Sequence, residues 1–362
     1  PERSEYHFTL AAAYLYQGEI KEALEVYDAI EKILGPSTDL IVHKHKLYLK
    51  LGESEKAIAE IQKLIDQNPT NIYFYGLLAN LYENEGFDSK ALEIYNKIVK
   101  IDPANGTVHL SLYEYYRYHG NHDKALSELI LAFENSTVDI DTKMQIMLQF
   151  FTNSERNEKV KTQAYRLARI LIDVHPNEAK SFSMFGDFLS RDGKLKEALQ
   201  MFKKAATLNS GKFPIWSQIV FLESDLKEFD LLEKDTRAAI EVFPTHPTFY
   251  FFNGIANIQL QNYDKAIKSL LSGKEMVFDN AQLQAEFYQY LGDAYHAKKE
   301  HVKSDESYDK SLEFNQYNPY VLNNYSYYLS QRKEKLALAE TMAKEANNQV
   351  PDSPNFIDTY AW

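Results

Sequence analysis

Apolar positions along the chain follow the spacing of one face of an α-helix, and small residues interrupt them at a constant interval. Four glycines lie 34 residues apart, and four alanines that follow them by five residues keep the same interval. These positions are Gly18, Gly52, Gly86 and Gly120, and Ala23, Ala57, Ala91 and Ala125. A fixed period of this length is typical of a chain that repeats one small structural unit.

The same period continues through the rest of the chain after a slip of five residues. Alanines keep the interval at Ala164, Ala198 and Ala266, which lie 34 and then 68 residues apart. Prolines recur 12 residues after the alanine position, at Pro69, Pro103, Pro176 and Pro244. Because proline lacks a backbone N–H and biases the residue before it away from helical geometry, each of these prolines predicts the end of a helix.

Residues 72–105 resemble the tetratricopeptide repeat. In that family a first helix carries a large residue, Leu, a small residue and Tyr, and a second helix carries Ala, an aromatic residue and a closing Pro. The matching residues are Tyr75, Leu78, Ala79, Tyr82, Gly86, Ala91, Tyr95 and Pro103. Residues 179–212 and 285–318 match the same pattern less completely. The resemblance implies an all-α fold, an α-α superhelix (solenoid) of helix–turn–helix repeats.

The spacing divides the chain into ten repeats and part of an eleventh, which we interpret as one solenoid domain over residues 1–362. The repeats are 4–37, 38–71, 72–105, 106–139, 140–178, 179–212, 213–246, 247–284, 285–318 and 319–353, followed by the partial repeat 354–362. The repeat 140–178 is degenerate, with five extra residues and a polar turn at 153–158. The segment 354–362 matches a first helix without its partner, so we expect the native protein to continue.

Two repeats place unexpected residues at the small site of the first helix. In 38–71 this site holds His45 and the preceding Leu site holds Lys44, and in 106–139 the small site holds Tyr113. We interpret His45 as a tolerated packing defect rather than a metal ligand. His119, His122 and Asp123 flank a predicted turn, and we interpret them as turn residues rather than a surface metal site.

Composition excludes several classes of function. The formal net charge of −12 would repel a phosphate backbone, so we expect no nucleic-acid partner. The chain has no cysteine, which excludes disulfides, thiolate metal sites and cysteine nucleophiles. No apolar run approaches the roughly 20 residues that span a bilayer, so we predict no transmembrane segment in this chain.

The sequence also lacks the common signatures of catalysis. It contains neither a glycine-rich phosphate loop, nor the H-E-x-x-H zinc motif, nor the G-x-S-x-G nucleophile motif. A solenoid groove is long and open, so it would not exclude water from a reaction. We therefore predict that the chain is not an enzyme and that it needs no cofactor and no metal.

The resemblance implies where a partner would bind, because the first helices of this family line the concave face. In the first half of the chain the groove candidates are Lys46, Lys50, Tyr73, Asn80, Asn84, Glu114, Arg117 and Tyr118. In the second half they are Asp187, Arg191, Phe251, Asp293, Tyr320, Asn323 and Tyr327, with Phe221, Asp225, Ile255, Gln259, His296 and Gln331. Rings and amide side chains suit a peptide partner. For Phe221, Phe251 and Tyr327, packing against the neighbouring repeat is an equal alternative.

The predicted function is that of a protein–protein interaction scaffold or adaptor that binds a peptide or helix in this groove. One alternative is a regulatory or targeting region of a larger enzyme whose catalytic part lies outside this chain. Another is a self-assembly module, a homo-oligomer formed through the C-terminal helix 354–362. Residues 323–331 and the C-terminal segment are similar to bacterial envelope lipoproteins with such arrays, which favours a periplasmic, outer-membrane-associated location over the cytoplasm.

Overall fold

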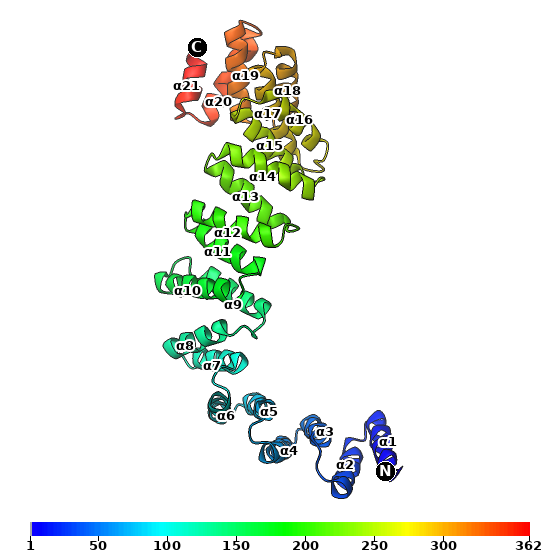
Figure 1. Cartoon of the computed structure of the whole chain (residues 1–362). Helices are drawn as coiled ribbons and strands as arrows, with labels where there is room; N and C mark the ends of the chain where they lie inside the picture. The colour runs from blue at the N-terminus through cyan, green and yellow to red at the C-terminus, as the bar shows by residue number, and fades with distance from the viewer. Residues whose placement is uncertain (1) are drawn as a thin grey trace. The chain divides into compact units, whose positions relative to one another are not determined.

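The computed structural model describes residues 2–362, with side chains from Tyr6 onward, and every regular element in that range is an α-helix. The helices form two compact units, unit 1 (Pro1–Pro176) and unit 2 (Asn177–Trp362). Within each unit, successive helices are joined into antiparallel pairs (Figure 1). The predicted all-α repeat fold is therefore confirmed, while the single domain predicted over residues 1–362 stays a prediction.

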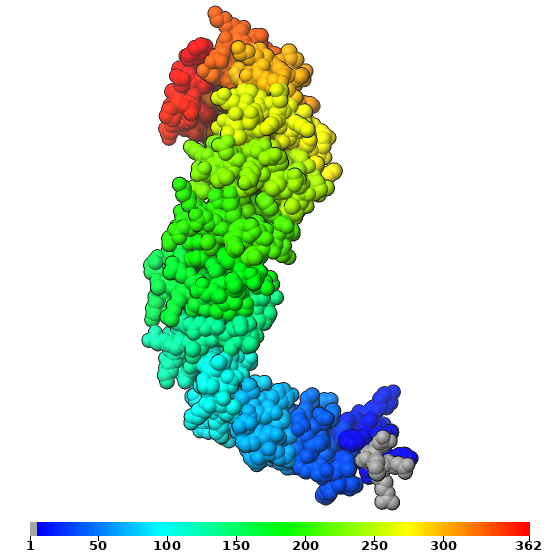
Figure 2. All heavy atoms as spheres, viewed as in Figure 1, coloured from blue at the N-terminus to red at the C-terminus, as the bar shows by residue number. Residues whose placement is uncertain are grey.

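Odd-numbered helices are the first helices of their pairs. The helices of unit 1 are α1 (Glu2–Gln17), α2 (Ile20–Leu34), α3 (Thr38–Lys50), α4 (Ser54–Gln67), α5 (Ile72–Asn84), α6 (Asp88–Ile101), α7 (Gly106–Tyr118), α8 (His122–Glu134), α9 (Ile140–Asn153) and α10 (Glu158–Val174). Those of unit 2 are α11 (Ala179–Arg191), α12 (Leu195–Leu208), α13 (Phe213–Asp225), α14 (Phe229–Val242), α15 (Pro247–Gln259), α16 (Tyr263–Lys274), α17 (Ala281–Ala297), α18 (His301–Phe314), α19 (Pro319–Arg332), α20 (Leu336–Gln349) and α21 (Pro354–Ala361). Drawn as spheres, the atoms of successive pairs in unit 2 lie against one another (Figure 2).

The turn inside a pair places one residue in the left-handed region of backbone space. In the first four pairs this residue is a glycine, with φ between 73° and 80°. Farther along the chain the equivalent positions hold Lys227, Gln261, Lys299 and Lys333, with φ between 58° and 64°. The turn therefore keeps its conformation where the glycine is lost, although a residue with a Cβ adopts it less readily.

Side-chain caps begin many of the first helices. Ser37, Asn71, Asn105 and Asp139, which are spaced by 34 residues, each accept a hydrogen bond from a backbone N–H of the helix that follows. The Asn105 Oδ1 atom, for example, accepts from the Val108 N–H at 3.0 Å. Such caps satisfy N–H groups that have no partner within the helix.

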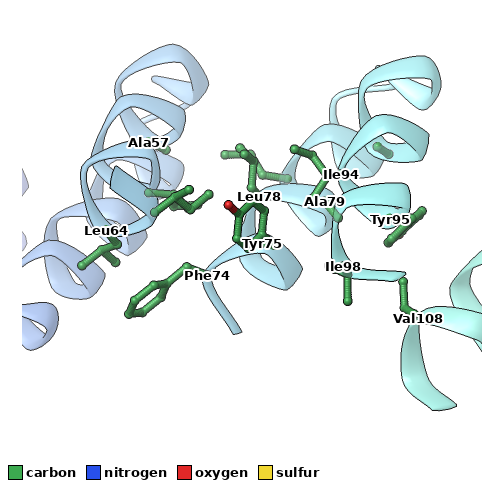
Figure 3. Packing of buried hydrophobic residues seen from close by; sticks show 14 of the residues in the cluster. Ala57, Leu64, Phe74, Tyr75, Leu78, Ala79, Ile94, Tyr95, Ile98 and Val108 are labelled. Atoms are coloured by element: carbon green, nitrogen blue, oxygen red, sulfur yellow. The ribbon is translucent and has the colours of Figure 1, made fainter. Parts of the chain in front are cut away.

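The core lies between neighbouring helices, and Figure 3 shows its part from α4 to α7. Tyr75 and Leu78 of α5 lie between α4 and α6, while Ile98 of α6 and Val108 of α7 lie next to each other (Figure 3). Ala57 and Ala79 are fully buried. Small residues at these sites let the helices approach closely, and the large rings fill the space that remains.

Within a pair, a small residue of the first helix often faces a large residue 16 positions later. A Cβ added at Gly186, Gly254 or Gly292 would lie 2.9, 2.5 or 2.6 Å from the side chain of Phe202, Leu270 or Tyr308, respectively. These three glycines are therefore required by packing rather than by backbone conformation. The family pattern of small and large residues is thus a description of how the two helices of a pair touch.

Lys44 is part of a buried ion cluster, which the sequence interpretation of its site did not anticipate. Its Nζ atom lies 2.6 Å from Asp28 Oδ1, 2.5 Å from Glu31 Oε2 and 2.9 Å from Glu60 Oε1. The side chain is 2% exposed. A lysine is tolerated at this apolar site because carboxylates from α2 and α4 surround its charge. His45 is buried beside it, and burial lowers the pKa of its imidazole.

Candidate functional site

All eight groove candidates of unit 1 are exposed on the first helices α3, α5 and α7. We call this surface the first-helix face of unit 1; it carries Lys46, Lys50, Tyr73, Asn80, Asn84, Glu114, Arg117 and Tyr118. Tyr73 is 57% exposed and Tyr118 is 85% exposed. Most of the surface of both rings is therefore open to contact with another molecule.

The groove candidates of unit 2 differ from one another in exposure. Tyr320 is exposed, whereas Asp187, Arg191, Asp293 and Tyr327 are half-buried. For Asp293 the reason is clear, because its Oδ1 atom accepts a 2.6 Å hydrogen bond from the Tyr308 hydroxyl of the same pair. Its burial raises the pKa of this carboxyl above the usual range. Asp293 therefore joins the two helices of its pair rather than facing an open groove.

Phe251 and Asn323 are buried, unlike the candidates of unit 1, and their place in a binding groove stays a prediction. Both residues occupy the fifth position of their repeats. The Phe251 ring packs against Phe287 and Tyr290 of α17, with centroids 5.2 and 5.3 Å apart. Phe251 thus packs against the neighbouring repeat, which was one of the two alternatives considered for it. This part of α15 faces the first helix of the next pair.

A cavity of about 380 Å³ opens between α5 and α7 on the first-helix face of unit 1. We call it the Gly76 cavity; it is lined by Ile72, Tyr73, Gly76, Leu77, Asn80, Tyr95, Ile98, Asn105, Thr107 and Val108. Two groove candidates, Tyr73 and Asn80, lie on its wall. No lining residue carries a charge, so the cavity suits an uncharged group.

A second cavity, of about 540 Å³, lies on the first helices of unit 2. We call it the Tyr290 cavity; it is lined by Ser224, Phe251, Phe252, Ile255, Gln282, Glu286, Gln289, Tyr290, Asn315, Tyr317, Asn318, Pro319 and Tyr320. Rings and amide side chains dominate its wall, and Glu286 is its one carboxylate. Groove candidates Phe251 and Tyr320 belong to this wall.

A third cavity, of about 380 Å³, lies where the degenerate repeat 140–178 packs against the pair before it. Its wall includes Tyr113, Arg117, Leu129, Phe150 and Val160. In the sequence, the polar turn and the five extra residues marked this repeat as irregular. The cavity itself was not predicted, because it depends on how α9 and α10 are placed.

Several polar groups on the first-helix face of unit 1 have no partner within the described residues. Lys46 and Lys50 form no ion pair, and the amides of Asn80 and Asn84 form no hydrogen bond through their side chains. Arg117 is different, because its Nη2 atom lies 2.5 Å from Glu114 Oε2. The face therefore offers unpaired lysines and amides to a ligand on α3 and α5. On α7, Glu114 and Arg117 form an ion pair with each other.

Half-buried Asp187 and fully buried Glu223 lie on the first helices of unit 2. Burial raises the pKa of Asp187 to about 6. Burial also raises the pKa of Glu223, although Lys203 Nζ lies 2.7 Å from its Oε1 atom and 2.8 Å from Asp235 Oδ2. The lysine joins α12 to α13 and α14 through these contacts, which gives the group a structural role.

Among the described side chains, no three histidines or carboxylates gather as they would around a metal ion. His119 instead lies with its Nδ1 atom 2.8 Å from the carbonyl oxygen of Tyr115 and stacks on the Tyr115 ring. The arrangement of the first-helix faces is suited to contact with another molecule through rings, amides and apolar cavities. Across residues 2–362, each helix is too short or too polar to cross a bilayer.

Comparison with known proteins finds a family match for part of unit 1. The tetratricopeptide repeat family matches residues 46–106, which run from α3 to the start of α7. The bovine protein "BBSome complex member BBS4" (Bos taurus) is 20% identical over 341 residues, covering 93% of this chain and 57% of that protein. The Arabidopsis thaliana "Protein CTR9 homolog" is 28% identical over 118 residues, or 32% of this chain and 11% of that protein. The chain thus spans at most about three fifths of these relatives.

Solved structures with a similar backbone include "Crystal structure of APC/C hetero-tetramer Cut9-Hcn1", with a TM-score of 0.47 and 14% identity over 99% of this chain and 96% of that chain. "Functional Characterization of Pseudomonas Aeruginosa pilF" has the same score and identity over 61% of this chain and 96% of that one. The tetratricopeptide repeat family model thus matches one part of the chain, residues 46–106, and helix pairs of the same kind follow one another through the described residues.

Proposed function

We propose that the chain is a protein-interaction scaffold that binds an extended peptide or a helix of a partner on the first-helix face of unit 1. Proteins of tetratricopeptide repeats generally mediate protein–protein interaction, and the family match supports a protein as the partner. The observation that carries the proposal is the set of exposed rings and unpartnered amides around the uncharged Gly76 cavity.

The chemistry of this face suits a polypeptide. Tyr73 and Tyr118 offer rigid rings that bury a large area at a low cost in side-chain entropy. The free amides of Asn80 and Asn84 can each donate to and accept from a peptide backbone. These two residues lie one helical turn apart on α5, so one extended segment can reach both.

A pull-down from the source organism with cross-linking tests the proposal, with the whole chain as bait. We expect the double variant Asn80→Ala/Asn84→Ala to recover at least about tenfold less of the main partner. The matched control is Asn96→Ala, which removes an exposed amide from the second helix α6. Both variants should keep the free energy of unfolding within about 0.5 kcal/mol of the parent. Equal recovery by both variants would reject the first-helix face as the binding surface.

A second candidate is a regulatory or targeting region of a longer enzyme. The human "Protein O-mannosyl-transferase TMTC1" is 22% identical over 227 residues, which is 62% of this chain and 21% of that protein. Its name describes a transferase, so arrays similar to this one occur in a protein named as an enzyme. Sequencing the gene on both sides of the region for residues 1–362 tests this candidate, since it requires a catalytic domain in the same reading frame.

Our proposal treats the 362 residues as non-catalytic and as needing no cofactor. Self-assembly through α21 and the bacterial envelope location stay predictions. Deleting residues 354–362 tests the first of them, because a dimer that persists in the shortened protein cannot depend on α21.

A further inference from the structure

The regular pairs of unit 1 cover an aromatic ring near the end of the first helix with a lysine of the second helix. Each lysine comes directly before the alanine position and follows its ring by eight residues. The distances from Nζ to ring centroid are 5.5 Å for Lys56 and Tyr48, 5.4 Å for Lys90 and Tyr82, and 5.2 Å for Lys124 and Tyr116. The ammonium group is attracted to the ring, so the lysine occupies one face of it.

The degenerate pair α9–α10 lacks this cover. The equivalent ring is Phe150, and Gln163 stands at the lysine position, 13 residues later instead of eight. The insertion lengthens α10 to 17 residues, whereas the other second helices of unit 1 have 13 to 15. Within the described residues, Phe150 has no aromatic or cationic partner. Phe150 and Gln163 instead line the cavity of about 380 Å³ at this repeat.

We call this space the Phe150 cavity, and its floor is apolar. Tyr113 and Leu129 are buried, and Leu126, Phe150 and Val160 are half-buried. More than half of the lining residues belong to the second helices α8 and α10, which lie against each other. The cavity is therefore separate from the Gly76 cavity between α5 and α7. Its volume lies in the range of about 300–1,000 Å³ that is usual for small-molecule sites.

Unpartnered amides form part of the rim of the Phe150 cavity. The side chains of Gln149, Asn153 and Gln163 line it and make no hydrogen bond within the described residues. A free amide can both donate to and accept from a ligand. With apolar side chains at the floor and amides at the rim, the cavity suits a molecule that has an apolar body and a polar end.

The charged side chains of the rim are basic. Arg117, His122 and Lys159 line the cavity and are exposed, whereas no carboxylate is among its lining residues. Two nearby carboxylates pair with the rim, because Glu114 lies 2.5 Å from Arg117 and Asp123 lies 3.4 Å from Lys159. These four side chains are all more than half exposed, and such ion pairs are weak. A carboxylate on a ligand can therefore compete for the two cations.

We propose that the Phe150 cavity binds a small aromatic carboxylate, with its ring against the uncovered face of Phe150 and its carboxylate at His122 and Lys159. The ring contributes apolar area and the favourable contact geometry of an aromatic pair. The carboxylate accepts charge-assisted hydrogen bonds from the rim. Glu155 and Glu158 of the adjoining turn do not line the cavity. This inference goes beyond the proposed function and does not depend on it.

Calorimetry with naphthoate as the probe and the whole 362-residue chain as the protein tests the proposal. The neutral amide, naphthamide, has the same shape and should bind at least about fivefold more weakly, because it lacks the charge. The saturated counterpart, decahydronaphthoate, should bind at least about threefold more weakly, because it lacks the aromatic ring. Equal affinity for naphthoate and naphthamide would overturn the proposal. So would the absence of naphthoate binding at about 1 mM.

Two variants locate the binding site. Val160→Phe fills the cavity and should weaken naphthoate by at least about tenfold. The matched control, Val99→Phe, changes a half-buried valine of α6 outside the cavity and should leave the affinity unchanged. His122→Gln/Lys159→Gln should weaken naphthoate and leave naphthamide unchanged, because only the carboxylate needs the charges. Parent-like binding of naphthoate by Val160→Phe would overturn the proposal.

A measurement on the parent protein covers the case in which Val160→Phe does not fold. The methyl chemical shifts of Leu126, Leu129 and Val160 should change when naphthoate is added, because these side chains line the cavity. The methyl shifts of Leu78, which is buried in the core around α5, should stay constant. Unchanged shifts of Leu126, Leu129 and Val160 at saturating naphthoate would overturn the proposal.

Discussion

At the scale of single residues, the buried cations of unit 1 show how the repeat accommodates polar groups. Lys44 is surrounded by three carboxylates, and these raise its pKa although burial alone would lower it. Glu31 is the counterpart: burial would raise its pKa, but Lys44 and Lys63 hold it below the usual value. Such a cluster is stable when complete and unfavourable when one partner is removed.

The variant Lys44→Met tests the ion cluster. It leaves Asp28, Glu31 and Glu60 close together without their cation, so we expect the free energy of unfolding to fall by about 3 kcal/mol. Urea denaturation measures the loss, with Lys46→Met as the control on the exposed side of the same helix. The loss should shrink as the pH falls through the lowered pKa of Glu31, because protonated carboxyls no longer need the cation. A loss that does not change with pH would contradict this electrostatic account.

Lys143 is also a buried cation, but it differs from Lys44 because its hydrogen bonds go to backbone carbonyls and an imidazole rather than to carboxylates. Its Nζ atom donates to the carbonyl oxygens of Phe133 and Asn135, at 2.9 and 2.7 Å, and lies 2.7 Å from His175 Nε2. Burial lowers the pKa of Lys143 from 10.5 to about 8. The folded protein therefore releases this proton at lower pH than the unfolded chain.

The sign of the resulting pH dependence follows from proton binding. Between pH 8 and 10.5 the unfolded chain holds more protons at this site, so stability rises with pH. We expect the free energy of unfolding of the parent, measured relative to Lys143→Met, to increase by up to about 3 kcal/mol across this range. Denaturation of both proteins at a series of pH values gives the difference. A constant difference would mean that the folded-state pKa of Lys143 is not lowered.

At the scale of elements, the glycines of the first helices divide into those that packing requires and the one that it does not. Gly292 faces the Tyr308 ring, whereas Gly76 faces open space. Gly292→Ala should lower the free energy of unfolding by about 1–3 kcal/mol, because the added Cβ would overlap the ring. Gly76→Ala should raise it by about 0.5–1 kcal/mol, because alanine favours the helix. Changes of the same sign in urea denaturation would disprove this division.

The repeat period and the helix pairs could be predicted because they depend on local chemistry. Glycine at the turn, the small residue of the first helix and the proline that closes the second each act within their own pair. The left-handed turns at Lys227 and Gln261 were not predicted, since neither residue favours that conformation by itself. The caps at Ser37, Asn71 and Asn105 were visible as a third 34-residue series and were missed.

The candidate site could be predicted in part. The residues chosen by their position in the first helices are exposed throughout unit 1, whereas Phe251 and Asn323 in unit 2 are buried. The fifth position of a first helix faces the next pair, so its exposure depends on the size of residues in a different repeat. Phe251 is covered because Phe287 and Tyr290 are large. The Gly76 cavity was not predicted for the same reason, since four of the residues that line it belong to α6 and α7.

At the scale of the whole molecule, two compact units each present first helices with their own cavity. The Gly76 cavity has uncharged walls, and the Tyr290 cavity adds amides and the carboxylate of Glu286. Neighbouring pairs in a repeat array contact mainly each other, so different partners or different parts of one partner can be bound by different pairs. The function proposed for unit 1 therefore does not depend on what unit 2 binds.

The most direct test of the central claim is site-specific photo-crosslinking in the source organism. A benzophenone side chain replaces Tyr73 on the first-helix face of unit 1 in one protein, and Leu131 on the second helix α8 in another. Both residues are exposed, at 57% and 43% respectively. We predict a discrete adduct with a partner protein from position 73 and none from position 131. Adducts from position 131 with none from position 73 would contradict the claim that the first-helix face of unit 1 binds proteins.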